Sequence, residues 1–224
     1  MNRITETADG SNTLYNESIG ENYHSKHGAL QESKHVFVDA GLKQAISSFP
    51  DQEISILEVG FGTGLNFLLS ADYCAEINVR LKYTGIEAFP LRSEELESTG
   101  YDKYVSKPLW DSLTLNYGKV MQQAVNILPN QQLKIVQTYL HRFTSTEQYN
   151  LLYYDAFSVQ HQPEMWTDEI IAHAVQFLKP QGIFVTYAIT GKLKRALKAV
   201  GFTIEKLPGA PGKREMLRAI KSNL

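Results

Sequence analysis

The sequence predicts an α/β fold built on a doubly wound, mostly parallel sheet of seven strands that ends in a C-terminal antiparallel hairpin. Three observations lead to this prediction. Short apolar segments alternate five times with helical segments, and such helices must cover both faces of a parallel sheet to bury their apolar stripes. Three glycines follow the first apolar segment directly. The last two apolar segments have only the turn PGAPG between them, which favours a hairpin over a crossover helix.

Length and composition favour one independently folding domain. The 224 residues are 43% hydrophobic and 21% charged, as in soluble globular proteins. No apolar run reaches ~18 residues and no apolar signal core follows the start, so we expect a cytoplasmic protein with no membrane partner. The single cysteine, Cys74, excludes an internal disulfide and is expected to be buried.

Charge is distributed unevenly along the chain. The formal net charge is −2, which argues against general binding of nucleic acid. From Thr190 to Leu224, however, nine Lys/Arg face two Asp/Glu, a net charge of +7, so the first 189 residues have a net charge of −9. The sequence therefore predicts a basic patch at the end of an acidic body.

The first elements follow from polarity and periodicity. Residues 1–32 are polar and rich in Gly, Asn and Ser, which predicts an irregular N-terminal extension with at most a short hairpin. Apolar residues then recur at helical spacing over 38–49, with Ser33 as a candidate N-cap and Pro50 as a stop.

The remaining elements follow from the same rules, strands from short apolar runs and helices from a period of 3.6 residues. Predicted parallel strands span 53–59, 81–88, 133–140, 150–157 and 182–188, and the hairpin strands span 202–207 and 213–220. One helix is predicted to begin after Gly64 and a short one to lie around 93–98. A third helix is predicted from Trp166, with Pro163 as its possible first residue, and a fourth over 193–200, with Gly201 as its C-cap. For the segment 101–128 the sequence predicts a helix and nothing more specific.

The strand-to-helix turn LEVGFGTGLN has the most specific spacing in the chain, with glycines at Gly60, Gly62 and Gly64. Bare backbone at such a turn lets a ligand approach closely. In the dinucleotide fingerprint G-x-G-x-x-G the third glycine would stand where Leu65 is, so that match fails. Together with Glu58 the pattern is E-x-G-x-G-x-G, which resembles the first motif of class I S-adenosylmethionine-dependent methyltransferases. A nicotinamide-dependent oxidoreductase remains an alternative.

Two further residues are assigned to the cofactor. Glu87 ends the second strand, 23 residues after Gly64, where an acid can accept hydrogen bonds from ribose hydroxyls. Asn66, the last residue of the turn motif, is assigned to the cofactor with the glycines. The segment TYLHRF after the third strand has no acid or amide, so the contact to adenine stays open.

The end of the fourth strand supplies the candidate catalytic residue. Ligands in open parallel sheets bind beyond the carboxyl ends of the strands, and Asp155 and Phe157 stand there. A protonated alkyl amine, with a pKa of ~10, has no free lone pair for methyl transfer. A carboxylate could hold and deprotonate it, so we assign Asp155 as general base and Phe157 as a ring on which a base stacks. His24 and His27 lack a third ligand, so no metal is expected.

Four segments together resemble one family. They are YHSKHGALQESKHVFVDAGL, ILEVGFGTGLN, YYDAFSVQHQPEMWTDE and GAPGKREMLRA. They are similar to the methyltransferase domain of the tRNA 5-methylaminomethyl-2-thiouridine biosynthesis family (MnmC and its stand-alone form MnmD), over about residues 20–220. The resemblance implies a Rossmann-like methyltransferase domain over 33–224.

The resemblance also implies an activity. The family uses S-adenosylmethionine to convert 5-aminomethyl-2-thiouridine at the tRNA wobble position to its methylaminomethyl form. It makes Asp155 the catalytic candidate and assigns Lys213 and Arg214 to substrate RNA or to stabilising the last strand. The basic segment from Lys192 to Lys221 is the expected RNA-facing surface. Bifunctional members have a flavin-dependent domain that this sequence lacks, so we expect a separate enzyme to supply the aminomethyl uridine. A small-molecule or protein amine remains an alternative acceptor.

Overall fold

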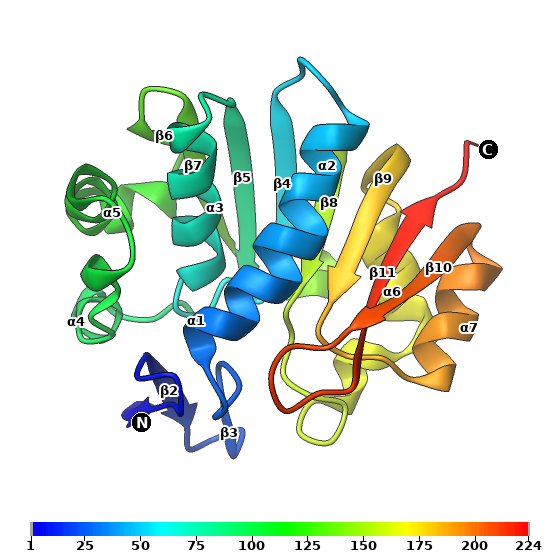
Figure 1. Cartoon of the computed structure of the whole chain (residues 1–224), viewed down its shortest axis with the longest axis horizontal. Coiled ribbons are helices and arrows are strands. Elements are labelled where there is room, and N and C mark those ends of the chain that lie inside the picture. Colours follow the sequence, from blue (N-terminus) through cyan, green and yellow to red (C-terminus); the bar gives the residue numbers. More distant parts are fainter. Residues whose placement is uncertain (1, 224) are drawn as a thin grey trace.

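The computed structural model describes residues 2–223. An eight-stranded sheet has helices on both faces, and a small second sheet lies beyond the carboxyl ends of its strands, at the lower left of Figure 1. The order of the large sheet is β10-β11-β9-β8-β4-β5-β7-β6. Its strands are β4 (Ile54–Val59), β5 (Leu81–Glu87), β6 (Val125–Leu128), β7 (Gln131–Gln137), β8 (Tyr149–Tyr154), β9 (Leu178–Thr186), β10 (Phe202–Pro208) and β11 (Glu215–Lys221).

The pairing confirms the predicted fold class. Strands β7, β5, β4, β8 and β9 are parallel neighbours, and β10 and β11 form the predicted antiparallel hairpin on β9. The sheet has one strand more than predicted because β6 pairs antiparallel with β7. It lies in the segment 101–128, which was predicted as helical and holds α5 (Lys107–Val120) as well. With four residues, β6 is too short for its alternation to stand out in the sequence.

Helices divide the core into two layers. A helical run and the helices α3 (Leu65–Glu76) and α5 cover one face, while α6 (Asp168–Val175) and α7 (Gly191–Ala199) cover the other. The run consists of α1 (Ala29–Glu32), the π-helix η1 (Ser33–Leu42) and α2 (Lys43–Ser48). Ser33 is thus buried inside the run, and its assignment as N-cap was wrong. None of the described helices is both long and apolar enough to cross a membrane.

Short elements refine the predicted boundaries. The strands β7 and β8 end three residues earlier than predicted, so Asp155 is the first residue after β8. Pro163 opens the 3-10 helix η4 (Pro163–Trp166), and Thr167 caps α6 by accepting from the Ile170 amide at 3.3 Å. The other short helices are α4 (Ser93–Glu97), η2 (Tyr101–Lys103) and η3 (Leu140–Arg142).

The N-terminal segment is ordered, in contrast to the irregular extension predicted over 1–32. The strands β1 (Asn2–Glu6), β2 (Asn12–Asn16) and β3 (Glu21–Asn22) form an antiparallel sheet. Leu14 is almost fully buried, and the Tyr101 hydroxyl donates to the Asn12 carbonyl at 3.0 Å. The predicted boundary between residues 32 and 33 falls inside the helical run, and the division into extension and catalytic domain stays a prediction.

Candidate functional site

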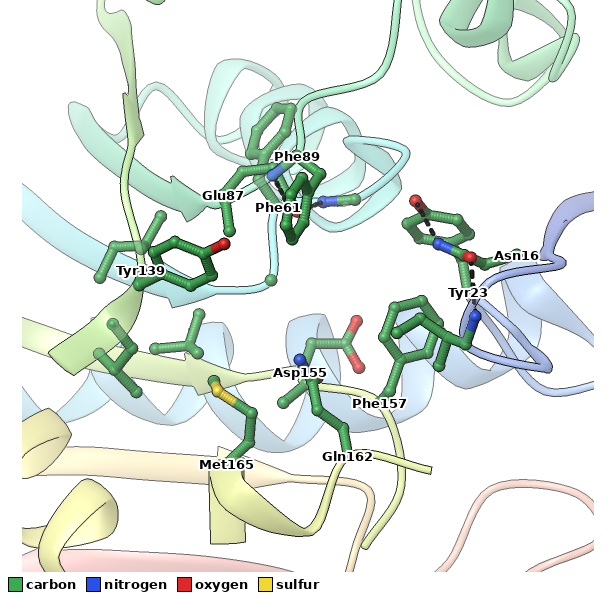
Figure 2. Close-up of a pocket in the computed structure, with 18 of the residues that line it drawn as sticks. Asn16, Tyr23, Phe61, Glu87, Phe89, Tyr139, Asp155, Phe157, Gln162 and Met165 are labelled. Atoms are coloured by element: carbon green, nitrogen blue, oxygen red, sulfur yellow. Dashed lines mark hydrogen bonds between the residues drawn. The ribbon is translucent and has the colours of Figure 1, made fainter. Parts of the chain in front are cut away.

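A cavity lies at the carboxyl ends of β4, β5, β7 and β8 (Figure 2). Its volume is about 130 Å³, and mainly apolar and aromatic side chains with a few polar groups line it, as in small-molecule sites. The chain moves from β4 to β5 on one side and later to β8 on the other, so the cavity lies at the switch point where open α/β sheets bind ligands.

The glycine turn forms one wall of this cavity. Gly60, Gly62 and Gly64 have φ angles of 84°, 51° and 75°, which favour glycine strongly over other residues. A Cβ on Gly60 would lie 2.5 Å from the Asp155 carbonyl oxygen, and one on Gly62 would lie 2.9 Å from the Tyr23 ring. The glycines therefore let Asp155 and Tyr23 pack closely against the turn, and they also leave its backbone bare where it faces the cavity.

The amides of the turn are already used within the protein. The amides of Gly60 and Phe61 donate to the Ile86 carbonyl at 3.0 and 3.2 Å, and that of Gly64 donates to Phe61 at 2.9 Å. The Gly62 amide donates to Glu87 Oε2 at 3.0 Å. These four N–H groups cannot also bind a pyrophosphate, and no Lys or Arg of the described residues lines the cavity. The wall is therefore poorly suited to a dinucleotide.

Glu87 is held so that its carboxylate lines the cavity. Its Oε2 accepts from the Gly62 amide and its Oε1 from the Phe89 amide, each at 3.0 Å. A carboxylate has about four lone-pair sites, so acceptor capacity remains on both oxygens. Glu87 can therefore accept hydrogen bonds from a pair of ligand hydroxyls.

Behind the turn, one amide joins two acids. The Asn66 Nδ2 group donates to Glu58 Oε1 and to Asp155 Oδ2, both at 2.8 Å. Glu58 is fully buried under the turn, whereas Asp155 is partly exposed and lines the cavity. Asn66 thus faces the acids and not the cavity, which gives it a different position from the one expected for a cofactor contact.

Burial raises the pKa of both acids. Burial and the charge of nearby Glu32 raise the pKa of Asp155 to about 8, although the hydrogen bond from Asn66 and the charge of Lys213 oppose the shift. Burial, with a contribution from Asp155, raises the pKa of Glu58 well above its ordinary value. Near neutral pH, Asp155 can therefore both accept and release a proton.

The aromatic side of the cavity comes from the N-terminal sheet and the loop after β8. The rings of Tyr23 and Phe157 meet edge to face with centroids 5.1 Å apart (Figure 2). Asn16 and Ile19 line the same wall, and so does His24, whose pKa burial lowers to about 4. Sequence reasoning missed these residues because their segment was expected to be irregular, although Tyr23 and His24 begin one of the motifs quoted above.

The opposite end is apolar. Ile86, Leu140 and Met165 line it, together with Phe89 and Tyr139. The last two rings lie 5.8 Å apart edge to face, and 70% of Phe89 is exposed. This end offers flat apolar surface for a planar group and includes Leu140, from the segment in which the adenine contact was left open.

The predicted site residues thus fall into three groups. Gly60, Gly62, Glu87, Asp155 and Phe157 line the cavity. Glu58, Gly64 and Asn66 lie behind its wall without lining it. Lys213 and Arg214 lie outside it in the β10–β11 turn.

The two basic residues differ in what they contact. Lys213 Nζ lies 2.5 Å from Glu32 Oε2 and 3.8 Å from the centroid of the Tyr187 ring. The Tyr187 hydroxyl in turn donates to the Ala156 carbonyl at 2.9 Å. Arg214 is exposed. Lys213 therefore connects the hairpin turn to the loop beside Asp155, while Arg214 faces solvent.

Among residues 2–223, no group of three or more His, Cys, Asp or Glu is placed to hold a metal ion.

Comparisons with known proteins agree on one class. Residues 105–222 match a family model described as S-adenosyl-L-methionine-dependent methyltransferase. The tRNA 5-methylaminomethyl-2-thiouridine biosynthesis bifunctional protein MnmC of Pseudomonas savastanoi pv. phaseolicola is 30% identical over 213 residues, which is 88% of this chain and 31% of the relative. MnmC of Methylobacillus flagellatus is 28% identical over 221 residues, 91% of this chain and 33% of the relative. The chain thus spans about a third of the length of these relatives.

A solved structure supports the fold. The crystal structure of MnmC2 from Aquifex aeolicus has a TM-score of 0.77 at 24% identity, and the match covers 98% of this chain and 70% of that one. The similarity extends over nearly all of the chain, including the N-terminal sheet.

Proposed function

Because the chain belongs to the S-adenosyl-L-methionine-dependent methyltransferase family, we propose that it methylates the 5-aminomethyl group of a wobble uridine in tRNA. The observation that supports this reaction best is the position of Asp155. Its carboxylate lines the cavity between the glycine turn and the aromatic wall of Tyr23 and Phe157 (Figure 2), where a cationic amine could meet it.

The residues present fit the cofactor by the chemistry of their side chains. S-adenosylmethionine is cationic at sulfur and at its amino group. The lining residues Glu87 and Asp155 are acids, and no Lys or Arg of the described residues lines the cavity with them. Glu87 would accept from the ribose hydroxyls with its remaining lone pairs. The apolar end around Ile86, Leu140 and Phe89 would hold the adenine.

When bound, S-adenosylmethionine supplies an electrophilic methyl group. The chain's part is to present an amine with a free lone pair about 3 Å from it. The pKa of an alkyl ammonium, ~10, is about six units above that of an ordinary aspartate. Proton transfer from the ammonium to such an aspartate therefore costs ~8 kcal/mol. Because burial raises the pKa of Asp155 to about 8, this gap is smaller for Asp155 than for an ordinary aspartate. Asp155 therefore acts as general base in this proposal.

Two observations support a tRNA substrate. The relatives are named for biosynthesis of a modified tRNA uridine. The helix α7, which follows β9, exposes Lys192, Arg195 and Lys198. Basic side chains on this helix would bind RNA phosphates.

The proposal has two corollaries. The acceptor amine must exist before it can be methylated, so a separate enzymatic activity supplies the aminomethyl uridine. With tRNA as the proposed substrate, we expect the protein to work in the cytoplasm.

Nucleoside analysis tests this function. Mass spectrometry of wobble nucleosides should find the aminomethyl nucleoside accumulating in cells that lack the gene, and the purified protein should methylate that tRNA in vitro. A normal nucleoside profile together with transfer to a small-molecule or protein amine would show that the substrate is wrong. Titration calorimetry with S-adenosylmethionine measures the cofactor site independently of any acceptor.

A further inference from the structure

The half of the cavity beyond Asp155 is closed by the N-terminal sheet. Two interactions fix this wall against the loop after β8. Glu21 Oε2 accepts from the Ser158 amide at 2.8 Å, and it lies 3.5 Å from His161 Nδ1. The wall and the loop therefore form one preorganised surface, and any ligand group beyond Asp155 must contact both.

Hydrogen-bond donors on this wall have a defined direction. Asn16 Oδ1 accepts from the amides of Ser18 and Ile19 at 3.0 and 3.1 Å, which fixes the orientation of the side-chain amide. Its Nδ2 points toward the Tyr23 hydroxyl, 3.5 Å away (Figure 2). One amide hydrogen of Asn16 and the phenol hydrogen of Tyr23 remain to be donated.

Tyr23 stays a donor throughout the working pH range. Burial and the charge of Glu87 raise the pKa of its phenol to about 12. The pair of Asn16 and Tyr23 therefore suits a ligand atom that only accepts, such as a carbonyl oxygen.

The same wall offers a ring for stacking. Phe157 lies between the Asp155 carboxylate and Tyr23 (Figure 2). The Trp166 Nε1 group donates to the Phe157 carbonyl at 2.8 Å, which holds the backbone of Phe157 in place. A planar base next to Phe157 would have its substituent within reach of Asp155.

We propose that Asn16, Tyr23 and Phe157 form the binding site for the uracil ring of the acceptor nucleotide. The ring packs against Phe157, while Asn16 Nδ2 and the Tyr23 hydroxyl donate to its O4 carbonyl. A cytosine would bring its N4 amino donor to this position in place of the O4 acceptor, so the wall selects uracil. This inference rests on the proposed function, since it takes the acceptor to be a uridine.

Binding measurements separate the inference from turnover. Two anticodon stem-loop RNAs, with 5-aminomethyluridine or 5-aminomethylcytidine at the wobble position, are titrated calorimetrically in the presence of S-adenosylhomocysteine. The wild type should prefer the uridine RNA by about tenfold. Asn16→Asp keeps the acceptor for Ser18 and Ile19 but replaces the donor with an oxygen, so the preference should disappear or invert. Tyr23→Phe should weaken uridine binding by about fivefold.

Tyr15→Phe is the matched control, because Tyr15 lies on the same small sheet but does not line the cavity; it should bind both RNAs as the wild type does. Equal binding of the two RNAs by the wild type, or an unchanged preference in Asn16→Asp, overturns the inference. Methylation of the same RNAs by the wild type is measured separately. If the wild type prefers the uridine RNA but does not methylate it, the uracil site is supported and the proposed function is refuted. If the wild type methylates the uridine RNA but binds both RNAs equally, the uracil site is refuted and the proposed function is supported.

Discussion

The Nδ2 atom of Asn66 lies 2.8 Å from Asp155 Oδ2 and donates to it, while its second hydrogen goes to the buried Glu58 at the same distance. One oxygen of Asp155 is thereby fixed to the helix that follows the glycine turn. Its orientation at the cavity therefore depends on a residue that does not line the cavity.

Loss of this amide should disturb catalysis more than cofactor binding. In Asn66→Ala, Asp155 loses its restraint and faces Glu58 without the shared donor. A misplaced catalytic group can cost about 100-fold in rate, so kcat should fall by that order while the Kd for S-adenosylmethionine stays close to normal. Asn116→Ala, which removes an amide bonded only to its own helix at Ser112, is the control. Equal kcat for Asn66→Ala and the wild type would refute the positioning role.

Replacement of the base itself should be more severe. Asp155→Asn preserves size and an acceptor for Asn66 but cannot take a proton, so turnover should fall by about 10²–10⁴-fold. Calorimetric binding of S-adenosylmethionine should be largely retained. Normal turnover by this variant, measured with a radiolabelled methyl donor, would show that Asp155 is not the base.

The raised pKa of Asp155 also predicts how stability changes with pH. Between the ordinary value of 3.8 and about 8, the folded protein binds more protons than the unfolded chain, so stability falls as pH rises. Charged groups near Asp155 are Glu32, Glu21 and Lys213, and Glu58 lies across the shared Asn66 amide. Asp155→Asn removes the titration, and its stability advantage over the wild type should therefore grow from pH 5 to pH 8 in thermal melts. An advantage that does not change with pH would contradict the assignment.

Gly60 tests the close approach of the turn to the loop after β8. A Cβ there would meet the Asp155 carbonyl at 2.5 Å, and φ is +84°, so Gly60→Ala should cost about 1–3 kcal/mol of stability from backbone strain alone. Gly118→Ala is the matched control, since Gly118 lies in α5 with nothing within 4 Å of its Cβ position, and it should stabilise by about 0.5–1 kcal/mol. Urea unfolding measures both, and equal effects would contradict the steric account.

Lys213 and Arg214 should separate into structural and RNA-binding roles. Lys213→Met leaves Glu32 buried without its ion pair, which should cost about 3 kcal/mol in urea unfolding. Arg214→Glu should leave stability unchanged, weaken tRNA binding and reduce its salt dependence. An Arg214→Glu variant that binds tRNA like the wild type across a salt series would remove Arg214 from the RNA surface.

Local signals in the sequence were sufficient for much of this architecture. The apolar runs at β4, β5 and β8 and the glycines after β4 are contiguous, so their periodicity predicts the parallel sheet and the position of Glu87 and Asp155 at its carboxyl edge. For the segment of the small sheet the sequence predicted at most a short hairpin, because β1 to β3 are short and polar. The π-helical winding of η1 has no local signal in its residues.

The site shows the same division. Asp155 and the glycine turn follow from strand ends, which the sequence marks. The shared amide of Asn66, the ion pair between Lys213 and Glu32, and the wall formed by Asn16 and Tyr23 join residues that are far apart in the chain. Such contacts exist only after the fold is assembled, so spacing along the sequence cannot predict them.

The strand order β10-β11-β9 has a consequence for how the protein is made. The strand β11 follows β10 along the chain but lies between it and β9, so β10 has no neighbour in the sheet until β11 is in place. Until then the flank of β9 is an open edge that another chain could pair with. Pairing of β11 with β9 therefore protects the newly synthesised protein from aggregation.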